Sequence, residues 1–309
     1  MPIGKYTLLD AVKLHAPEAT QEVVNEAAKL SPEMSILPMR TIETTSYKAL
    51  VRTGNPVVSF RGMNQGVPQS KASFVERLFQ TFTLDHQVQI DRAMRDEMGE
   101  AGFGLLMKEH TVATLQGLFD LISTQLYYGN PDVDKGFPGL LSQYAADAAH
   151  EVDATGTTNK FSIWMLNTST GNCGLVAGGG RQAGFEQGPW ELKDVKDDEE
   201  NTYQAFCSWL YGSLGFELKN KHAALRGKNF SATESGKGVT DAVLNALWTK
   251  AIRNGTRPDT ILMPPEGVEQ LRLSRTPTNE KGDPVPRPTD WQGIPILETA
   301  GIAIGAAGE

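Results

Sequence analysis

Histidines and cysteines are the first residues of this chain that could carry out chemistry, as bases, nucleophiles or metal ligands. The five histidines show neither the HxxxH nor the HExxH spacing that places two imidazoles on one helix face for zinc. They are His15, His86, His110, His150 and His222. Cys173 and Cys207 form no CxxC or Cys/His zinc pattern, and no GxSxG nucleophile motif occurs. We therefore predict no metal, no cofactor and two reduced, inert thiols.

A glycine run and adjacent carboxylates are the remaining candidates for chemistry. Gly178, Gly179 and Gly180, with Gly184 close behind, lack the GKS/T ending of a phosphate-binding loop and the spacing of a dinucleotide fingerprint. We predict a loop or a tight turn between strands there. Adjacent carboxylates, as in Asp96-Glu97 and Asp197-Asp198, generally point apart, which argues against acid/base catalysis. The sequence thus predicts no catalytic residue and no enzyme, with a monomeric hydrolase or binding module as the less favoured class.

Composition narrows the class of protein. The 309 residues carry a formal net charge of −8, which disfavours a tight sheath on nucleic acid but is compatible with the wall of a container. The 31 glycines and 17 prolines favour a β-rich, loop-rich architecture. No apolar stretch is long enough for a membrane span and the N-terminus does not resemble a signal peptide, so we expect a soluble, non-secreted protein. A solvated loop is predicted for the acidic residues Asp194, Asp197, Asp198, Glu199 and Glu200.

The N-terminal third predicts two elements that lack a core of their own. Residues 1–40 alternate short helical patterns with prolines, including an apolar helix face that ends before Pro32. This face consists of Val23, Val24, Ala27 and Leu30. Such a segment is expected to be an arm lying across this subunit's body or a neighbour's. Residues 45–76 are rich in β-branched and aromatic residues around a polar, glycine-bearing stretch, which predicts a long hairpin. Because an isolated two-stranded ribbon is marginal in water, it should lean on a partner.

Residues 108–128 predict one central helix. Leu115, Phe119, Ile122 and Leu126 recur at helical spacing and should form its packed face. Gly129-Asn130-Pro131 should stop the helix, with the glycine left-handed.

The C-terminal half alternates predicted strands and helices. Residues 136–235 read as strands with one covered face. Thr240 should cap a helix over 241–253, and it is followed by the strand TILMP, a short helix over 268–273, a polar loop over 274–290 and the strand GIPILET.

In this order, the elements resemble the major capsid proteins of tailed bacteriophages, which have the Hong Kong 97-type fold, and particularly the short-tailed-phage branch. VSFRGMNQGVPQSKASF resembles the extended loop of that family, and the long helix running into YYGNPDVDKGFPGLLSQY resembles its spine helix and following turn. PDTILMPPEGVEQLR and WQGIPILET resemble the late strand, short helix and closing strand.

The resemblance implies an α+β fold in five parts. These are an N-terminal arm (1–44), an extended hairpin loop (45–78), a peripheral domain with the spine helix (79–135), an axial domain (136–275) and a return to the peripheral domain (276–309). It also implies pentamers and hexamers that close an icosahedral phage head around double-stranded DNA, without sequence-specific contact. The chain would then be part of the virion, assembled in the bacterial cytoplasm. An encapsulin-like nanocompartment shell is the alternative with the same fold.

Partners and contact residues follow from this interpretation. Only about 40 residues precede the predicted hairpin, too few for the cleaved scaffolding region of some relatives, so a separate scaffolding protein is expected. A portal and possibly a decoration protein are the other expected partners. The basic residues Arg61, Lys71 and Arg77 could meet acidic surface on a neighbouring subunit, with 194–200 one candidate. The simpler alternative, that both segments are merely solvated, is favoured over this specific pairing.

Overall fold

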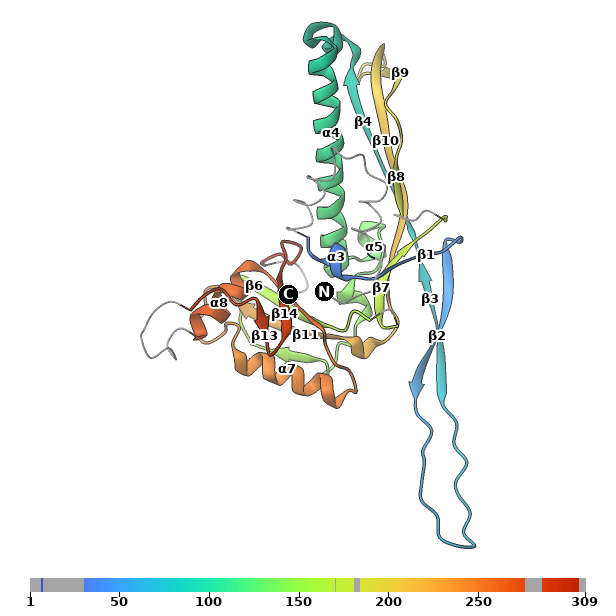
Figure 1. The fold of residues 1–309 in the computed structure, drawn as a ribbon, viewed down its shortest axis with the longest axis vertical. Coiled ribbons are helices and arrows are strands. Elements are labelled where there is room, and N and C mark those ends of the chain that lie inside the picture. Colours follow the sequence, from blue (N-terminus) through green and yellow to red (C-terminus); the bar gives the residue numbers. More distant parts are fainter. Residues whose placement is uncertain (1–6, 8–30, 170, 181–183, 276–284, 306–309) are drawn as a thin grey trace.

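The computed structural model describes residue 7 and residues 31–169, 171–180, 184–275 and 285–305. Within them the chain forms two six-stranded sheets, a two-stranded hairpin and helices of very different lengths (Figure 1). The predicted arm helix with Val23 to Leu30 lies outside the described residues, as does much of the predicted loop over 274–290.

The helix α4 (Arg92–Tyr128) is the longest element that the structure describes. It begins at residue 92 instead of the predicted 108, because Asp91 caps it by accepting a hydrogen bond from the amide of Ala93 at 2.8 Å. The added N-terminal part contains Gly99, whose φ of 73° breaks the helical geometry. Sequence patterns missed this part because its glycines lower helix propensity and most of its residues are exposed, so no apolar stripe marks it.

At its other end α4 stops at Tyr128, the predicted residue, but by a different device. Gly129 has φ −50° and ψ 125°, so it is extended and not left-handed as predicted. A Cβ on Gly129 would lie 2.3 Å from the carbonyl oxygen of Phe137, so glycine is required for close approach of two backbone segments. Asn130 then caps the short helix α5 (Pro131–Asp134) by accepting from the amide of Asp132.

The first sheet is organised by β10 (Thr202–Leu218), a strand of 17 residues. On one side it pairs antiparallel with β4 (Phe82–Asp91), and on the other with β7 (Cys173–Ala177), β8 (Phe185–Gln187) and β9 (Glu191–Lys196). The strand β1 (Met39–Thr41) adds to β7 in parallel. α4 runs alongside β4 and β10, so helix and sheet form one elongated limb (Figure 1).

The second sheet forms a separate lobe at the base of that limb. Its order is β13-β14-β12-β6-β11-β5, and α7 lies against β11 and β5. The strands are β5 (Glu151–Asp153), β6 (Lys160–Leu166), β11 (Ala224–Ser231), β12 (Thr260–Met263), β13 (Asp290–Trp291) and β14 (Ile294–Glu298).

The helices of this lobe follow the predicted pattern with two differences. α7 (Asp241–Arg253) has the predicted bounds, and Thr240 occupies the N-cap position, yet its side chain makes no capping hydrogen bond. Asp241, the first residue of α7, pairs with Arg275 at the end of α8 (Pro265–Arg275) at 2.7 Å. α8 is longer at both ends than the predicted 268–273.

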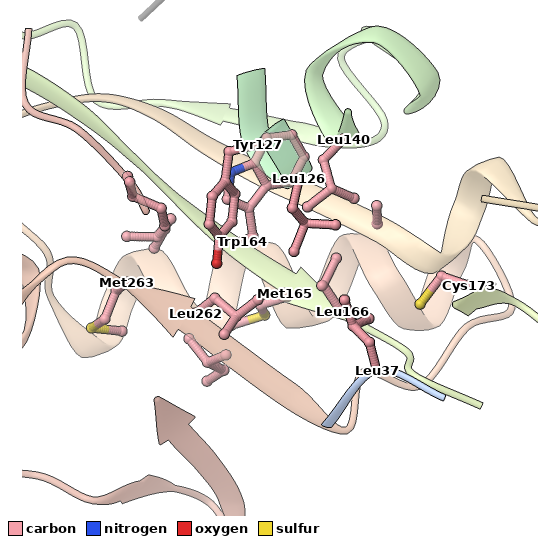
Figure 2. Packing of buried hydrophobic residues seen from close by; sticks show 14 of the residues in the cluster. Leu37, Leu126, Tyr127, Leu140, Trp164, Met165, Leu166, Cys173, Leu262 and Met263 are labelled. Atoms are coloured by element: carbon pink, nitrogen blue, oxygen red, sulfur yellow. The ribbon is translucent and has the colours of Figure 1, made fainter. Parts of the chain in front are cut away.

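One hydrophobic core joins the end of α4 to the second sheet. Leu126 and Tyr127 of α4 lie over Trp164, Met165 and Leu166 of β6 (Figure 2). Other members of the same cluster, also shown in Figure 2, are Leu37, Leu140, Cys173, Leu262 and Met263. Leu115, Phe119 and Ile122, the remaining residues of the predicted packed face, are buried in it too.

The described end of the arm packs on its own subunit. Met34 in α3 (Glu33–Ile36) and Leu37 after it are fully buried in the main core. The sequence left open whether this segment covers its own body or a neighbour's, and residues 34–39 cover their own.

Candidate functional site: the hairpin and its base

A hairpin projects from the base of the limb, away from β9 and the start of α4 (Figure 1). It consists of β2 (Ser46–Gly54) and β3 (Ser73–Gln80), paired antiparallel, and of a connecting loop over 55–72. The register shifts between Arg52 and Gly54, close to where the loop begins. Such a ribbon buries little of its own surface.

Apolar side chains are exposed along this hairpin, above all in the loop. A cluster of exposed large apolar residues on a soluble chain marks a surface that contacts another molecule. In the loop these residues are Val57, Val58, Phe60, Met63 and Val67, and on the strands they are Leu50, Phe74, Val75 and Leu78. The sequence reasoning noted only that the hairpin cannot bury itself. The apolar residues inside the glycine-bearing stretch were the available signal for the contact surface.

The base of the hairpin is tied to the end of β10. Arg77 donates from Nη1 to the carbonyl oxygen of Leu218 at 3.1 Å. Arg40 of β1 pairs with Glu217 at 3.3 Å, and its guanidinium lies 3.8 Å from the ring centroid of Tyr47 in β2. Glu217 also pairs with Lys219 at 2.8 Å, and burial raises the pKa of its carboxyl group. The arrangement orients the hairpin while leaving its loop uncovered.

The three predicted basic contact residues therefore have different surroundings. Arg61 is exposed and donates to the carbonyl oxygen of Gln65 in its own loop at 3.3 Å, and Lys71 is exposed beside the start of β3. Arg77 is engaged with Leu218 inside its own subunit.

The acidic residues lie at the opposite end of the molecule from the hairpin loop, so the two segments of one subunit are far apart (Figure 1). Asp194 belongs to β9, so the predicted solvated loop is half strand. Asp197, Asp198, Glu199 and Glu200 form the turn that follows. Asp197 accepts from the amides of Asn201 and Glu199 at 2.8 and 2.9 Å, and the hydrogen bond from Asn201 chiefly lowers the pKa of the Asp197 carboxyl.

The glycine run and the two cysteines, considered above as candidates for chemistry, lie in structural parts of the fold. Gly178 to Gly180 follow β7 and Gly184 precedes β8, which is the predicted connection between strands, with 181–183 outside the described residues. Cys173 and Cys207 are both buried. In the described part of the chain, no cluster of three or more metal-binding side chains occurs and no helix has the length and apolar character needed to cross a bilayer.

A contact between two histidines is the feature that sequence patterns missed. His150 Nε2 lies 2.6 Å from His222 Nδ1, and His150 Nδ1 lies 2.5 Å from Asp147 Oδ1. The two histidines are 72 residues apart, so no spacing motif could reveal them. The sequence could have indicated only the contact of Asp147 with His150, because these two residues are three positions apart.

Glu33 is a second buried polar site, where three distant segments meet. Its Oε1 accepts hydrogen bonds from the hydroxyl of Tyr127 at 2.6 Å and from that of Thr299. It thus joins the end of the arm to α4 and to the segment after β14. Burial in this apolar environment raises the pKa of the Glu33 carboxyl above its usual range.

Replacing Glu33 by Gln should therefore change how stability depends on pH. Because the folded state holds the proton more tightly than the unfolded chain, wild-type stability falls as pH rises from the ordinary carboxyl range through the raised pKa. Glu33→Gln keeps an acceptor for Tyr127 and Thr299 without that penalty. Its free energy of unfolding, measured by urea denaturation, should gain on the wild type as the pH rises above the ordinary carboxyl range. The exposed Glu43→Gln is the control, and an equal pH dependence of both variants would contradict this role of Glu33.

Comparison with known proteins decides the family. The model of the family described as "Major capsid protein GP7" matches residues 17–299. The chain belongs to this family. Its role is structural, as a subunit of a phage capsid, and the encapsulin alternative is not favoured.

Solved structures agree with this membership at the level of fold. A chain of bacteriophage Epsilon15 matches with a TM-score of 0.59 and 17% identity, over 85% of each chain. A chain of the bacteriophage JBD30 capsid matches with a TM-score of 0.53 and 13% identity, over 89% of this chain and 92% of that one. A search of the curated proteins gave no match. The predicted α+β fold of the Hong Kong 97 type is thereby confirmed for this capsid protein.

Proposed function

We propose that copies of this capsid protein assemble with one another through the hairpin, forming the pentamers and hexamers of an icosahedral head. The exposed apolar loop of the hairpin carries this proposal, because a cluster of exposed large apolar residues marks a surface that contacts another molecule. The occupant we favour is a second copy of the chain, because a shell protein meets mostly copies of itself.

A groove on the limb is the acceptor that we favour for this loop. It has a volume of about 570 Å³ and lies between α4 and β4. Its apolar wall contains Leu84, Val88, Leu118, Leu121 and Leu210. The hairpin projects away from α4 and β4 of its own subunit (Figure 1), so the hairpin that we propose in this groove belongs to a neighbouring copy. Burying a large apolar side chain contributes about 1.5–3 kcal/mol, and association costs about 4–15 kcal/mol, so several loop residues must be buried together.

The finer organisation that we propose follows the resemblance to tailed-phage capsid proteins. The five parts are the arm (1–44), hairpin loop (45–78), peripheral domain (79–135), axial domain (136–275) and returning segment (276–309). The head would enclose double-stranded DNA without sequence-specific contact, consistent with the acidic net charge of −8. A separate scaffolding protein, a portal and a decoration protein are the proposed partners, with assembly in the host cytoplasm.

Negative-stain electron microscopy of the purified chain, alone and with its scaffolding protein, tests this proposal. Closed shells built from pentamers and hexamers are the expected result. A chain that stays monomeric under both conditions and shows hydrolase activity would contradict it. Particles isolated from infected cells that contain protein cargo instead of DNA would contradict the proposed contents.

A charge contact between subunits is a weaker part of the same proposal, in which Arg61 meets acidic surface on a neighbour. Individual exposed pairs contribute about 0–1 kcal/mol, but a shell repeats each contact in every subunit. Arg61→Glu should therefore slow assembly measured by light scattering, as should raising salt from about 0.05 to about 0.5 M, which shortens the screening length.

Two further variants separate the possible partners of Arg61. Reversing the charge of both Asp197 and Asp198 should partly rescue Arg61→Glu if these residues are its partners. The exposed Arg257→Glu should assemble as the wild type does. Impaired assembly without rescue would exclude this pairing, and unimpaired assembly of Arg61→Glu would exclude the charge contact itself.

A further inference from the structure

The histidine contact joins two segments beneath the hairpin. His150 is buried at the end of a turn in which Asp147 is about half exposed. His222 belongs to the short helix η1 (Lys221–Ala223), which follows β10. The ring centroids of the two imidazoles are 4.8 Å apart and their planes are 24° from parallel, so the rings meet edge to edge through the nitrogen contact. The contact therefore fastens η1 to the turn that leads into β5.

The distances dictate how protons are arranged in this chain of groups. The Asp147 carboxylate accepts from His150 Nδ1–H, which leaves His150 Nε2 as an acceptor for His222 Nδ1–H. One additional proton can be shared by the two rings beside the carboxylate. A second additional proton would put two cations within 2.6 Å with hydrogen on both facing nitrogens, so the contact must break.

The other charges around the pair make a second proton less favourable. Lys221 and the charge of His150 both lower the pKa of His222, after the larger effect of burial, and Asp147 opposes them. Lys250 approaches the turn by donating to the carbonyl oxygens of Ala148 and Glu151. Arg226 donates to the carbonyl oxygen of His150 through its backbone amide. Among the described residues, Asp147 is the carboxylate bonded to the pair, and Lys221 is the neighbouring cation that disfavours a further proton on His222.

His222 also forms part of the wall of a cleft beneath the hairpin. The cleft has a volume of about 500 Å³, and the opposite wall is formed by residues 49–55, most of them from β2. His222 is only partly buried, so it is the ring that can move out when the contact breaks. Its movement would add positive charge to a cleft that already contains Arg52 and Lys219.

We propose that Asp147, His150 and His222 form an acid-sensitive clasp that holds η1 in place and controls the cleft beneath the hairpin. Above the ordinary titration range of histidine the clasp is closed. As pH falls below that range the second proton enters, the clasp opens and the His222 ring moves toward β2. The consequence for assembly rests on the proposed function of the hairpin, whereas the clasp itself does not.

Hydrogen exchange of the full chain at about pH 8 and pH 5, corrected for intrinsic exchange rates, tests the clasp. In the wild type, protection of residues 145–152 and 219–224 should fall about tenfold or more at the lower pH. Residues 160–166 of β6 serve as the internal reference for global unfolding. His222→Gln, which can hydrogen-bond but not titrate, should lose this pH dependence. His86→Gln, a histidine on β4, is the matched control and should behave as the wild type.

Either of two exchange results would overturn the clasp. One is equal protection of both segments at the two pH values in the wild type. The other is an unchanged acid response in His222→Gln. Nitrogen-15 NMR of the wild-type imidazoles gives a check that does not depend on the folding of a variant: His150 should be protonated at Nδ1 at neutral pH, and the opposite tautomer would also overturn the clasp.

Shell formation is scored separately by electron microscopy at about pH 8. A wild type that never assembles would remove the proposed function of the hairpin, and the exchange data would still decide the clasp. Normal shells with no acid response at 145–152 would leave the proposed function of the hairpin intact and overturn the clasp.

Discussion

Removing residues 55–70 should abolish shell formation and leave a folded, soluble subunit. The deletion takes away the exposed apolar loop residues but none of the buried cluster. Gly54 and Ser73 are register partners, so an inserted Asn-Gly followed by Lys71 and Ala72 can close the shortened hairpin as a four-residue loop. Circular dichroism and thermal unfolding should match the wild type, while negative-stain images should show no particles. Normal particles from this variant would exclude the hairpin as the assembly element.

A point variant separates the apolar contact from the length of the hairpin. Phe60→Ser keeps the loop but removes its most exposed aromatic side chain, which contributes about 1.5–3 kcal/mol if it is buried by a neighbour. We expect the subunit concentration needed for assembly to rise about tenfold or more. Leu273→Ser on α8 removes an exposed apolar residue elsewhere and is the control. An equal effect of both variants would indicate general solubility instead of a specific contact.

Phe119→Ala should destabilise the subunit by about 3–5 kcal/mol, the range for removing a buried aromatic ring and leaving a cavity. Phe119 is 1% exposed and belongs to the cluster that joins α4 to the second sheet. The free energy of unfolding, from urea denaturation of the unassembled subunit, is the measurement.

The control for this variant lies two residues away on the same helix. Leu121 is 52% exposed, so Leu121→Ala should cost less than about 1 kcal/mol in the isolated subunit. In the assembled shell the order of effects can differ, because Leu121 lines the groove proposed for the neighbouring hairpin. A change below about 1 kcal/mol for Phe119→Ala in the isolated subunit would show that the helix does not pack as described.

Local sequence signals predicted those elements whose causes are local. The bounds of α7 and the end of α4 were predictable because apolar spacing, glycine and proline act within a few residues. The hairpin was predictable from β-branched residues on either side of a glycine-bearing stretch. The start of α4 was not predictable from the sequence, because residues 92–107 contain several glycines and few buried residues. The helix packs there against β4 and β10, a contact that exists only in the folded chain.

The sequence by itself thus determined the class of fold, the helix face formed by Phe119 and its neighbours, and the presence of the long hairpin. Only the tertiary structure decided which polar groups meet. Arg77 bonds to a carbonyl oxygen 141 residues away, His150 meets His222 across 72 residues, and Glu33 meets Thr299 across 266. Hydrogen bonds and ion pairs need groups within about 3 Å, a condition set by how sheets and helices pack and not by spacing along the chain. Apolar periodicity has no such requirement, because burial depends only on which face of an element is covered.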